Sequence, residues 1–296
     1  MTADKKVEIK RLLIYLALSF GLTWIIFFAY ILNGGKWDGS NPYMEQFVGL
    51  GMLMPFIAHI LTRMITKEGF AMTGKDSIML GISFKDKKWK YYLFAIFVPW
   101  LYFEVMHILA LALVPESFDT NVANDIGLNN DIAFAYPFIV IINTTILSFP
   151  ALGEEGGWRG YMMPKLMKLM SMPKALIAGG IIWGLWHAPI TCIGHNFGTD
   201  YPGFPYVGIL LMCGFCISLG IMLTYITIKS QSIWPAAFMH AVNNGNPSIV
   251  KFFMNTDVFE QKYPGPVYSY LLLLIPMLLI DLIIIVLEMK KAKKVK

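Results

Sequence analysis

The sequence predicts an all-α membrane protein, a bundle of about eight transmembrane helices with both termini in the cytoplasm. Two observations predict this class. Hydrophobic residues make up 56% of the 296 residues and charged residues only 15%, whereas soluble domains average roughly 45–50% and 25%. The charged residues are also grouped between long apolar runs, which is typical of membrane-spanning segments rather than of a soluble core.

Eight apolar segments follow one another, and most reach the roughly 20 residues that cross about 30 Å of hydrocarbon. The first is longer than a signal-peptide core and no small-residue cleavage site follows it, so we expect an uncleaved span. The fifth and seventh are short or interrupted by glycine, proline and asparagine, so they need protein rather than lipid around them. The segments are residues 12–32, 47–65, 91–114, 136–156, 175–190, 204–228, 232–250 and 267–287.

The distribution of lysine and arginine predicts the orientation. With the N-terminus inside, 21 of the 24 basic residues fall in cytoplasmic segments and 3, namely Lys36, Lys251 and Lys262, in outer loops. The loop before the fourth segment carries acidic residues and no basic one. The positive-inside rule therefore supports both the count and the orientation. We expect the C-terminal lysines to lie beside anionic lipid in the cell membrane and not to bind nucleic acid.

Neither the cysteines nor the chain organisation suggests a second module. Cys213 and Cys216 form a CxxC inside the sixth segment, without the second pair or polar loop of a metal or redox site, so we expect small buried apolar residues. No internal repeat, low-complexity tract or linker is visible. Residues 1–296 are expected to form a single integral membrane domain, with the candidate catalytic motifs within residues 154–244.

Ionisable side chains inside a membrane segment are costly, so each needs a partner or a function. Three of them, in the third and eighth segments, have no motif around them, and for these we expect structural hydrogen bonds. The other four fall into the three groups described next. The full set is Glu104, His107, Glu154, Glu155, His187, His240 and Asp281.

The first group is a pair of adjacent carboxylates followed by an arginine, Glu154-Glu155-Gly-Gly-Trp-Arg159. Adjacent residues point about 100° apart on a helix, so the two carboxylates cannot share one role. Glu155 and Arg159, four residues apart, are expected to pair along one face, which leaves Glu154 free to act. Arginine is rare in this lysine-rich chain, so its place here suggests that a planar bidentate donor is needed. The alternative is a helix end with interfacial charges.

The other two groups place histidines at helical spacing. Trp183 and His187 share a face, so the indole can shield the imidazole from lipid, although a lone histidine on an apolar face is more often a satisfied core residue than a catalyst. His240 and Asn244 also share a face and must look into the bundle, where interhelical hydrogen bonding is the alternative. At 1.5 Å per residue, the depths of the groups agree only to within about 10 Å. This agreement is compatible with one cavity opening toward the cytoplasm.

The order Glu-Glu-x-x-x-Arg, aromatic-x-x-x-His and His-x-x-x-Asn, over the last helices of an eight-span protein, resembles the CPBP intramembrane proteases. This family holds the CAAX prenyl endopeptidases and bacteriocin-processing or immunity proteins, also called Abi proteins. The motifs cover Glu154 to Asn244, and the hydrophobic layout extends the resemblance over most of the chain. Trp183 stands where phenylalanine is commoner in the family, and it keeps an aromatic wall.

The resemblance implies an endopeptidase that works inside the membrane. Glu154 would be the general base, with His187 assisting it in activating a water. His240 and Asn244 would hold the oxyanion, while Glu155 and Arg159 would shape and orient the site. The implied substrate is a membrane-associated peptide or protein, with a prenylated C-terminal peptide and, equally, a leader peptide or another membrane protein as alternatives. Amide hydrolysis needs such a base and such donors, and no serine or cysteine has the spacing of a nucleophile motif.

Whether a metal takes part is left open by the residues. Glu154, His187 and His240 could hold zinc with a water as fourth ligand. The chain lacks HExxH, and Asn244 is a poor zinc ligand, so we favour a glutamate-based mechanism that requires no cofactor. The family is nevertheless often labelled a metalloprotease.

Two other functions compete with proteolysis. A bacteriocin-immunity or scaffold protein of the same fold would use the motifs for binding or packing. A transporter would use Glu104, His107 and Asp281 as a relay. Transporters often show paired repeats with matching broken helices, and the sequence shows none.

Overall fold

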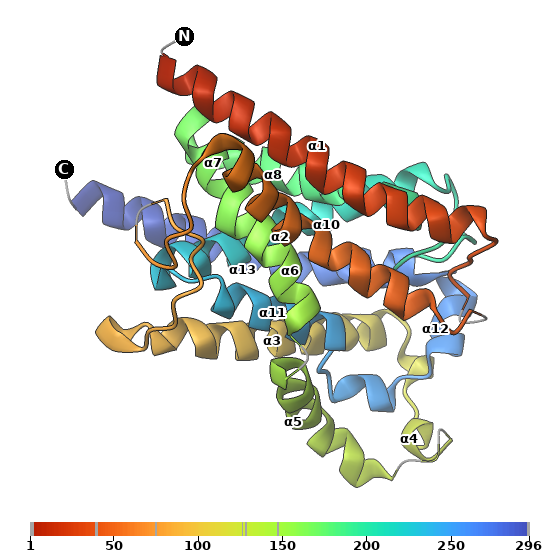
Figure 1. Ribbon diagram of the computed structural model, residues 1–296. Helices are drawn as coiled ribbons and strands as arrows, with labels where there is room; N and C mark the ends of the chain where they lie inside the picture. Colours follow the sequence, from red (N-terminus) through yellow and green to blue (C-terminus); the bar gives the residue numbers. More distant parts are fainter. Residues whose placement is uncertain are drawn as a thin grey trace.

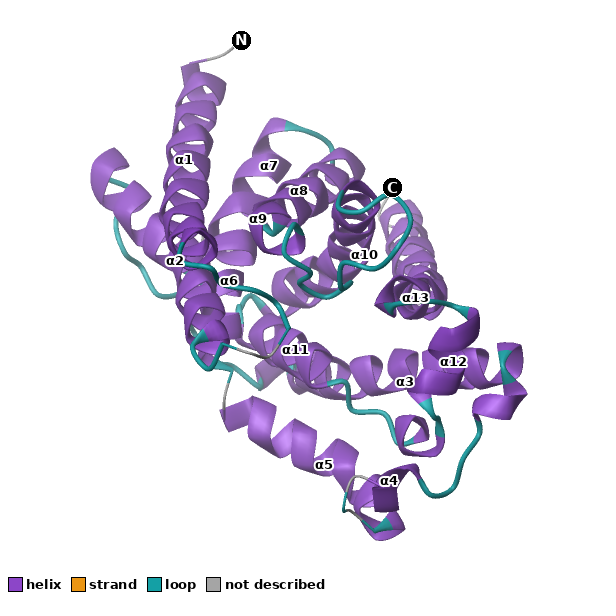
Figure 2. Cartoon of the chain, turned by 90° about the vertical axis from the view of Figure 1, so that its right-hand side faces the viewer, coloured by secondary structure: helices purple, strands orange, loops and turns teal. Residues whose placement is uncertain are grey.

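The computed structural model describes residues 3–294 except 39, 40, 75, 126, 128 and 147. Within these residues the chain is helical and contains no strand, as Figure 2 shows. The predicted all-α class is therefore confirmed. Lys75 and Lys296, which we counted on the cytoplasmic side, lie outside the described residues.

Five helices among the described residues are long and apolar enough to cross a membrane. They correspond to the first, second, third, sixth and eighth predicted segments. The chain is thus a multi-pass membrane protein. The second, third and sixth segments begin and end close to the predicted bounds, whereas the first helix begins at Ala3 instead of Leu12 and the last continues to Lys294 instead of Leu287. The helices are α1 (Ala3–Leu32), α2 (Met44–Thr66), α3 (Trp89–Leu113), α10 (Tyr206–Ser230) and α13 (Pro266–Lys294).

The fourth predicted segment is not one straight helix. Its residues belong partly to α5 (Asn130–Ile146) and partly to α6 (Phe149–Gly157), and the chain bends by 61° between them. From α6 the helix runs on through the π-helical turn η3 (Trp158–Met162) into α7 (Met163–Leu169). The two carboxylates therefore lie in the first half of a continuing helix and not at the end of a span. Counting the bent pair as one span gives up to six.

The fifth and seventh predicted segments are shorter than a membrane is thick. Helix α8 (Met172–Trp186) has 15 residues and α11 (Trp234–Gly245) has 12, against the roughly 20 that a span requires. Helix α8 packs along α10, and α11 packs against α3 and α6. Because both helices lie against other helices, the polar backbone groups at their ends can be surrounded by protein instead of lipid. The predicted count of about eight spans is not confirmed.

Glycines set the distance between the central helices. On α6, a Cβ at Gly153 would lie 2.6 Å from the Met52 carbonyl oxygen, and one at Gly157 would lie 2.5 Å from the backbone carbon of Pro55. The same four-residue spacing recurs on α8, where Gly184 faces the backbone of Cys213 on α10. Small residues four apart allow helix backbones to approach closely in membrane proteins. Helices α6 and α8, which carry Glu154 and Trp183, therefore each lie tightly against a long neighbouring helix.

The helix order places the two chain ends on one side of the molecule. Figure 1 shows both termini on the left and the turn between α1 and α2 on the right, together with α12 (Thr256–Lys262). The short elements complete the connections: η1 (Lys85–Lys87), η2 (Pro115–Ser117), α4 (Val122–Asp125), α9 (Ala188–Thr191) and η4 (Val250–Phe253). We call the side with the termini the basic end and the other side the loop end.

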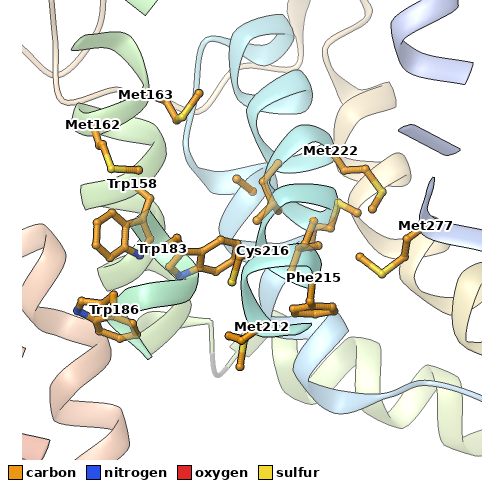
Figure 3. Close-up of a cluster of buried hydrophobic side chains, with 14 of the residues drawn as sticks. Trp158, Met162, Met163, Trp183, Trp186, Met212, Phe215, Cys216, Met222 and Met277 are labelled. Carbon is orange, nitrogen blue, oxygen red and sulfur yellow. The ribbon is translucent and has the colours of Figure 1, made fainter. Parts of the chain in front are cut away.

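The core between these ends is aromatic and sulfur-rich. Figure 3 shows Trp158, Trp183 and Trp186 grouped opposite Met212 and Phe215, and all five are buried. Cys213 and Cys216 are buried as free thiols, which confirms their expected apolar role. This core surrounds the polar groups described below.

Candidate active site

Helix α6 carries the two adjacent carboxylates into the interior, where Glu154 is 2% exposed and Glu155 is 0% exposed. The glycines beside them let α6 lie directly on α2, which excludes lipid from this face. The expected pair forms, because Arg159 Nη1 lies 3.1 Å from Glu155 Oε1. The same oxygen accepts a hydrogen bond of 2.9 Å from His240 Nδ1. Glu155 thus links α6 to α11.

Glu154 has different partners, as the helical spacing predicts. Its Oε2 accepts hydrogen bonds from two indole nitrogens, Trp183 Nε1 at 2.6 Å and Trp158 Nε1 at 3.2 Å. The Arg159 guanidinium carbon lies 4.1 Å from the centre of the Trp183 ring. Trp183 therefore holds one carboxylate and carries the arginine that pairs with the other. The interfacial-charge alternative does not fit side chains this deeply buried.

His59, which belongs to none of the three sequence motifs, holds this part of α6. His59 Nε2 accepts a hydrogen bond of 2.6 Å from Arg63 Nε, so its Nδ1 donates to the Gly156 carbonyl oxygen, 2.8 Å away. The π-helical turn at residues 158–162 changes the hydrogen-bond pattern next to Gly156. The α2 pair His59 and Arg63 fixes the backbone immediately after the two carboxylates. Sequence reasoning missed it, because it left His59 out of the intramembrane ionisable residues and placed Arg63 outside the membrane.

His187 directly follows α8. Its Nδ1 donates to the Trp183 carbonyl oxygen at 2.9 Å, which leaves Nε2 as the ring's other polar atom. Trp186 packs edge-on against the imidazole at 4.7 Å between ring centres, and His195 stacks on it at 6.0 Å. Trp183 lies at 6.0 Å. The predicted aromatic wall exists, but Trp186 is its nearer part and the Trp183 nitrogen serves Glu154.

Helix α11 presents His240 and Asn244 to the same region, and the His240 ring lies edge-on to Trp183 at 5.4 Å. Between them Asn243 is buried and accepts a hydrogen bond of 2.7 Å from the Tyr102 hydroxyl. Asn243 Nδ2 in turn donates to Asn244 Oδ1 at 3.2 Å. Because its oxygen is already engaged, Asn244 faces the cavity as a donor.

All four predicted catalytic side chains line one cavity of about 380 Å³. This volume is in the range of small-molecule sites. Most of the remaining wall is apolar, and Asn243, Trp186 and His195 line it without having been predicted. Its lining also includes Trp37, Asn196, Asn246 and Glu45, of which Glu45 at the start of α2 is exposed. The four predicted residues are Glu154, His187, His240 and Asn244.

The described part of the chain forms no cluster of metal ligands. Among the described residues, no three His, Cys, Asp or Glu side chains come together so that they could hold a metal ion. The Nδ1 atoms of His187 and His240 donate to protein oxygens, an arrangement that metal-bound histidines also show, so the missing cluster is the observation that bears on the zinc alternative.

The other ionisable residues make structural bonds. Glu104 accepts hydrogen bonds from the Trp100 indole at 2.7 Å, the Ser248 hydroxyl at 2.9 Å and backbone nitrogens after it. His107 Nδ1 bonds the Phe103 carbonyl, and Asp281 accepts from Ser218. None of Glu104, His107 and Asp281 lines the cavity. The relay that a transporter would need is therefore not formed by these three.

Comparison with known proteins points in one direction. Residues 134–245 match a family described as type II CAAX prenyl endopeptidase Rce1-like. The chain is also 24% identical over 251 residues to CAAX prenyl protease 2 of Methanococcus maripaludis, across 83% of this chain and 88% of that protein. The matched family segment contains all three sequence motifs, from the adjacent carboxylates to the last asparagine.

Proposed function

The family match and the curated relative support membership of a CPBP, CAAX protease-like family, and from that premise we propose that this protein is an intramembrane endopeptidase whose active site is the cavity around Glu154. The observation that carries the proposal is the meeting of Glu154, His187, His240 and Asn244, from three helices or their ends, around one cavity. Structural hydrogen bonding alone would not require these groups to border an open space.

Glu154 is the general base in this proposal. A carboxylate can remove a proton from a water that attacks the peptide carbonyl, provided that the water lies within hydrogen-bond reach of it. The two indole donors fix the direction of the carboxylate, and His187 offers Nε2 to the same cavity. His187 then assists in holding the water and in passing the proton toward the leaving amine.

His240 and Asn244 stabilise the oxyanion. Amide hydrolysis develops negative charge on the former carbonyl oxygen, and donors aimed at that point in a dry pocket lower the barrier. Glu155 accepts a hydrogen bond from His240 Nδ1, so His240 donates to the oxyanion through Nε2 as the doubly protonated imidazolium in this proposal. Asn243 Nδ2 donates to Asn244 Oδ1, so the amide hydrogens of Asn244 are left for the oxyanion. Glu155 and Arg159 act as positioning residues.

We propose that no metal is required, since the described residues bring no three potential metal ligands together. The substrate is a membrane-associated peptide or protein. Its apolar part would lie against Phe103, Met106, Met212, Phe215 and Leu273, the side chains that line the wall. Both a prenyl group and a hydrophobic peptide segment have the chemistry to fit such a surface.

The test is cleavage by the purified protein in vesicles. A prenylated CAAX peptide and a non-prenylated membrane-anchored peptide are each offered to the unaltered protein and to Glu154→Gln, with and without a zinc chelator. We expect cleavage of at least one peptide, loss of about 10²–10⁴-fold in the variant and no effect of the chelator. Full activity of Glu154→Gln would exclude the proposed base, and loss of activity with the chelator that zinc restores would exclude a metal-independent mechanism.

A matched control comes from the same chain. Glu104→Gln changes another intramembrane carboxylate, one that lies outside the cavity and holds the turn after α11. It is expected to lower stability more than activity per folded molecule. The two variants together separate chemistry from folding.

A further inference from the structure

The proposed mechanism gives no role to His195, although this side chain lines the active-site cavity together with Glu154, His187 and His240. His195 follows α9 and belongs to none of the three sequence motifs. Its Nδ1 atom is buried and has no hydrogen-bond partner among the described residues. The ring therefore has one other polar atom, Nε2, to present to the cavity.

The backbone around His195 is fixed by its neighbours. The His195 backbone nitrogen donates to the Ile190 carbonyl oxygen at 3.0 Å. Gly194, directly before it, has a φ of 104°, a conformation that glycine adopts without strain. Two residues after His195, the fully buried Phe197 packs edge-on against Tyr270 at 4.7 Å between ring centres. The turn after α9 thus brings His195 to a defined place.

Two aromatic neighbours also orient the ring itself. The Trp37 indole, from the connection between α1 and α2, lies edge-on to the His195 imidazole at 4.3 Å between ring centres. The His187 ring lies within 6° of parallel to it at 6.0 Å. Trp37 also lines the cavity. The His195 ring is therefore oriented by the protein before a substrate binds.

The surroundings also decide which nitrogen of His195 carries the proton. Burial lowers the pKa of His195, so its ring is neutral at pH 7 and has a single N–H group. A buried N–H without an acceptor is costly, so the proton belongs on Nε2 and not on the buried Nδ1. His187 has the opposite arrangement, because its Nδ1 donates to the Trp183 carbonyl oxygen and its Nε2 can accept. The cavity thus has an imidazole acceptor and an imidazole donor next to each other.

From this geometry we infer that His195 is a substrate-binding residue, whose Nε2–H group donates to a backbone carbonyl oxygen of the bound peptide. An extended chain advances about 3.3–3.6 Å per residue. The distance of 6.0 Å between the rings of His195 and His187 therefore places this carbonyl one or two residues from the scissile bond. The inference rests on the proposed function, because it takes His187 to mark the scissile bond.

Two substitutions of His195 separate the donor from the ring. His195→Phe keeps a flat ring beside Trp37 and His187 but removes the donor. His195→Gln removes the ring but keeps an N–H group at about the reach of Nε2. We expect His195→Phe to raise KM about tenfold with little change in kcat, and His195→Gln to restore most of the affinity. Thr199→Ala, exposed in the same loop, is the matched control and should leave KM unchanged.

The opposite pattern would overturn the inference. If His195→Phe keeps the KM of the unaltered protein while His195→Gln loses activity, the ring only packs against its neighbours. A fall in kcat of His195→Phe at unchanged KM would likewise overturn it, because a donor that binds the substrate equally in the ground state and the transition state changes KM.

The same hydrogen bond is tested from the peptide. Once the products give the scissile bond, each peptide bond one or two residues from it is replaced by an alkene isostere, which lacks the carbonyl oxygen. One of these peptides should have a KM about tenfold higher with the unaltered protein and no further loss with His195→Phe. Equal losses in both proteins at every position would overturn the inference.

Equilibrium binding separates this inference from the proposed function. The prenylated CAAX peptide and the non-prenylated membrane-anchored peptide are titrated into vesicles that contain Glu154→Gln, with and without His195→Phe. Weaker binding with His195→Phe, without cleavage by the unaltered protein, would refute the protease and keep His195 as a peptide contact. Cleavage together with binding that does not depend on His195 would keep the protease and refute the inference. If neither peptide binds, both fail.

Discussion

Glu154 and Glu155 are neighbours in the chain, yet each has a different set of partners. Glu155 is tied to Arg159 and His240, whereas Glu154 accepts hydrogen bonds from two indole nitrogens and borders the cavity. The difference follows from the helix, which turns adjacent side chains about 100° apart. A buried charge with a cation and an imidazole as partners suits a structural and positioning role. A carboxylate held by neutral donors beside an open space suits proton transfer.

Asn243 and Asn244 offer a matched comparison at this scale. Asn244→Ala removes a donor that faces the cavity, so kcat is expected to fall by about 10²–10³-fold. Its effect on thermal unfolding should be small, because this side chain is exposed. Asn243→Ala instead leaves the Tyr102 hydroxyl without its acceptor, and should lower the melting temperature more. Kinetics and thermal unfolding of both variants check this, and equal effects on kcat would contradict the assignment.

At the scale of elements, α6 and α8 are positioned by glycines. Both helices lie against long neighbours, α2 and α10, with too little room for a Cβ at the contact. His187 follows directly after α8, and Glu154 lies on α6 between Gly153 and Gly157. The distance between base and imidazole is thus set by two helix contacts outside the cavity.

Gly184→Ala tests the second of these contacts. The added methyl carbon would lie 2.5 Å from Cys213 Cα, a backbone atom that cannot turn aside. Overpacking of this kind costs typically about 1–3 kcal/mol. We expect a lower melting temperature together with reduced kcat, because His187 directly follows α8. Gly214→Ala is the control, since its nearest neighbour would be 4.0 Å away; an equal loss in both would contradict the argument.

Helix periodicity and apolar length were enough to predict the long spans and the Glu155–Arg159 pair. They were not enough for the break between α5 and α6 or for the short α8 and α11. An apolar segment has the same kind of sequence whether lipid or other helices surround it, so composition alone does not separate the two cases. Likewise nothing local marks His59, because its role depends on the Gly156 carbonyl nearly a hundred positions along the chain.

At the scale of the whole molecule, the two ends differ in what they contain. The connection between α1 and α2 at the loop end contributes Trp37 to the lining of the cavity, and the basic end carries a network of charged side chains around Glu68. Lys165 on α7 donates to Glu68, Tyr161 donates at 2.5 Å and Thr66 at 2.7 Å. Arg11 on α1 lies 3.6 Å from the same carboxylate. Glu68 therefore joins α1, the end of α2 and the helix that continues from α6.

The pH dependence of stability tests this network. Burial raises the pKa of Glu68, but hydrogen bonds from Lys165, Tyr161 and Thr66 outweigh it and hold the pKa below the ordinary value of 4.5. A carboxyl whose pKa is lower in the folded state than in the unfolded state stabilises the protein at any pH above the unfolded-state pKa. This stabilisation is lost as the pH falls through the folded-state pKa. The Glu68→Gln variant should therefore have a lower melting temperature at pH 7, and its melting temperature should fall less on acidification. The measurement is the melting temperature of both proteins in detergent from neutral to acid pH. An equal fall in melting temperature on acidification in the variant and the unaltered protein would contradict the role of Glu68.

The central claim is that residues from separate helices act on one water in one cavity. The most direct measurement is a double-mutant cycle of kcat for Glu154→Gln and His187→Ala on a cleaved membrane peptide. Groups that serve the same step are not additive, so the double variant should be about as slow as the slower single variant. If the two losses multiply as for independent sites, or if Glu154→Gln keeps the full rate, the proposed active site is contradicted.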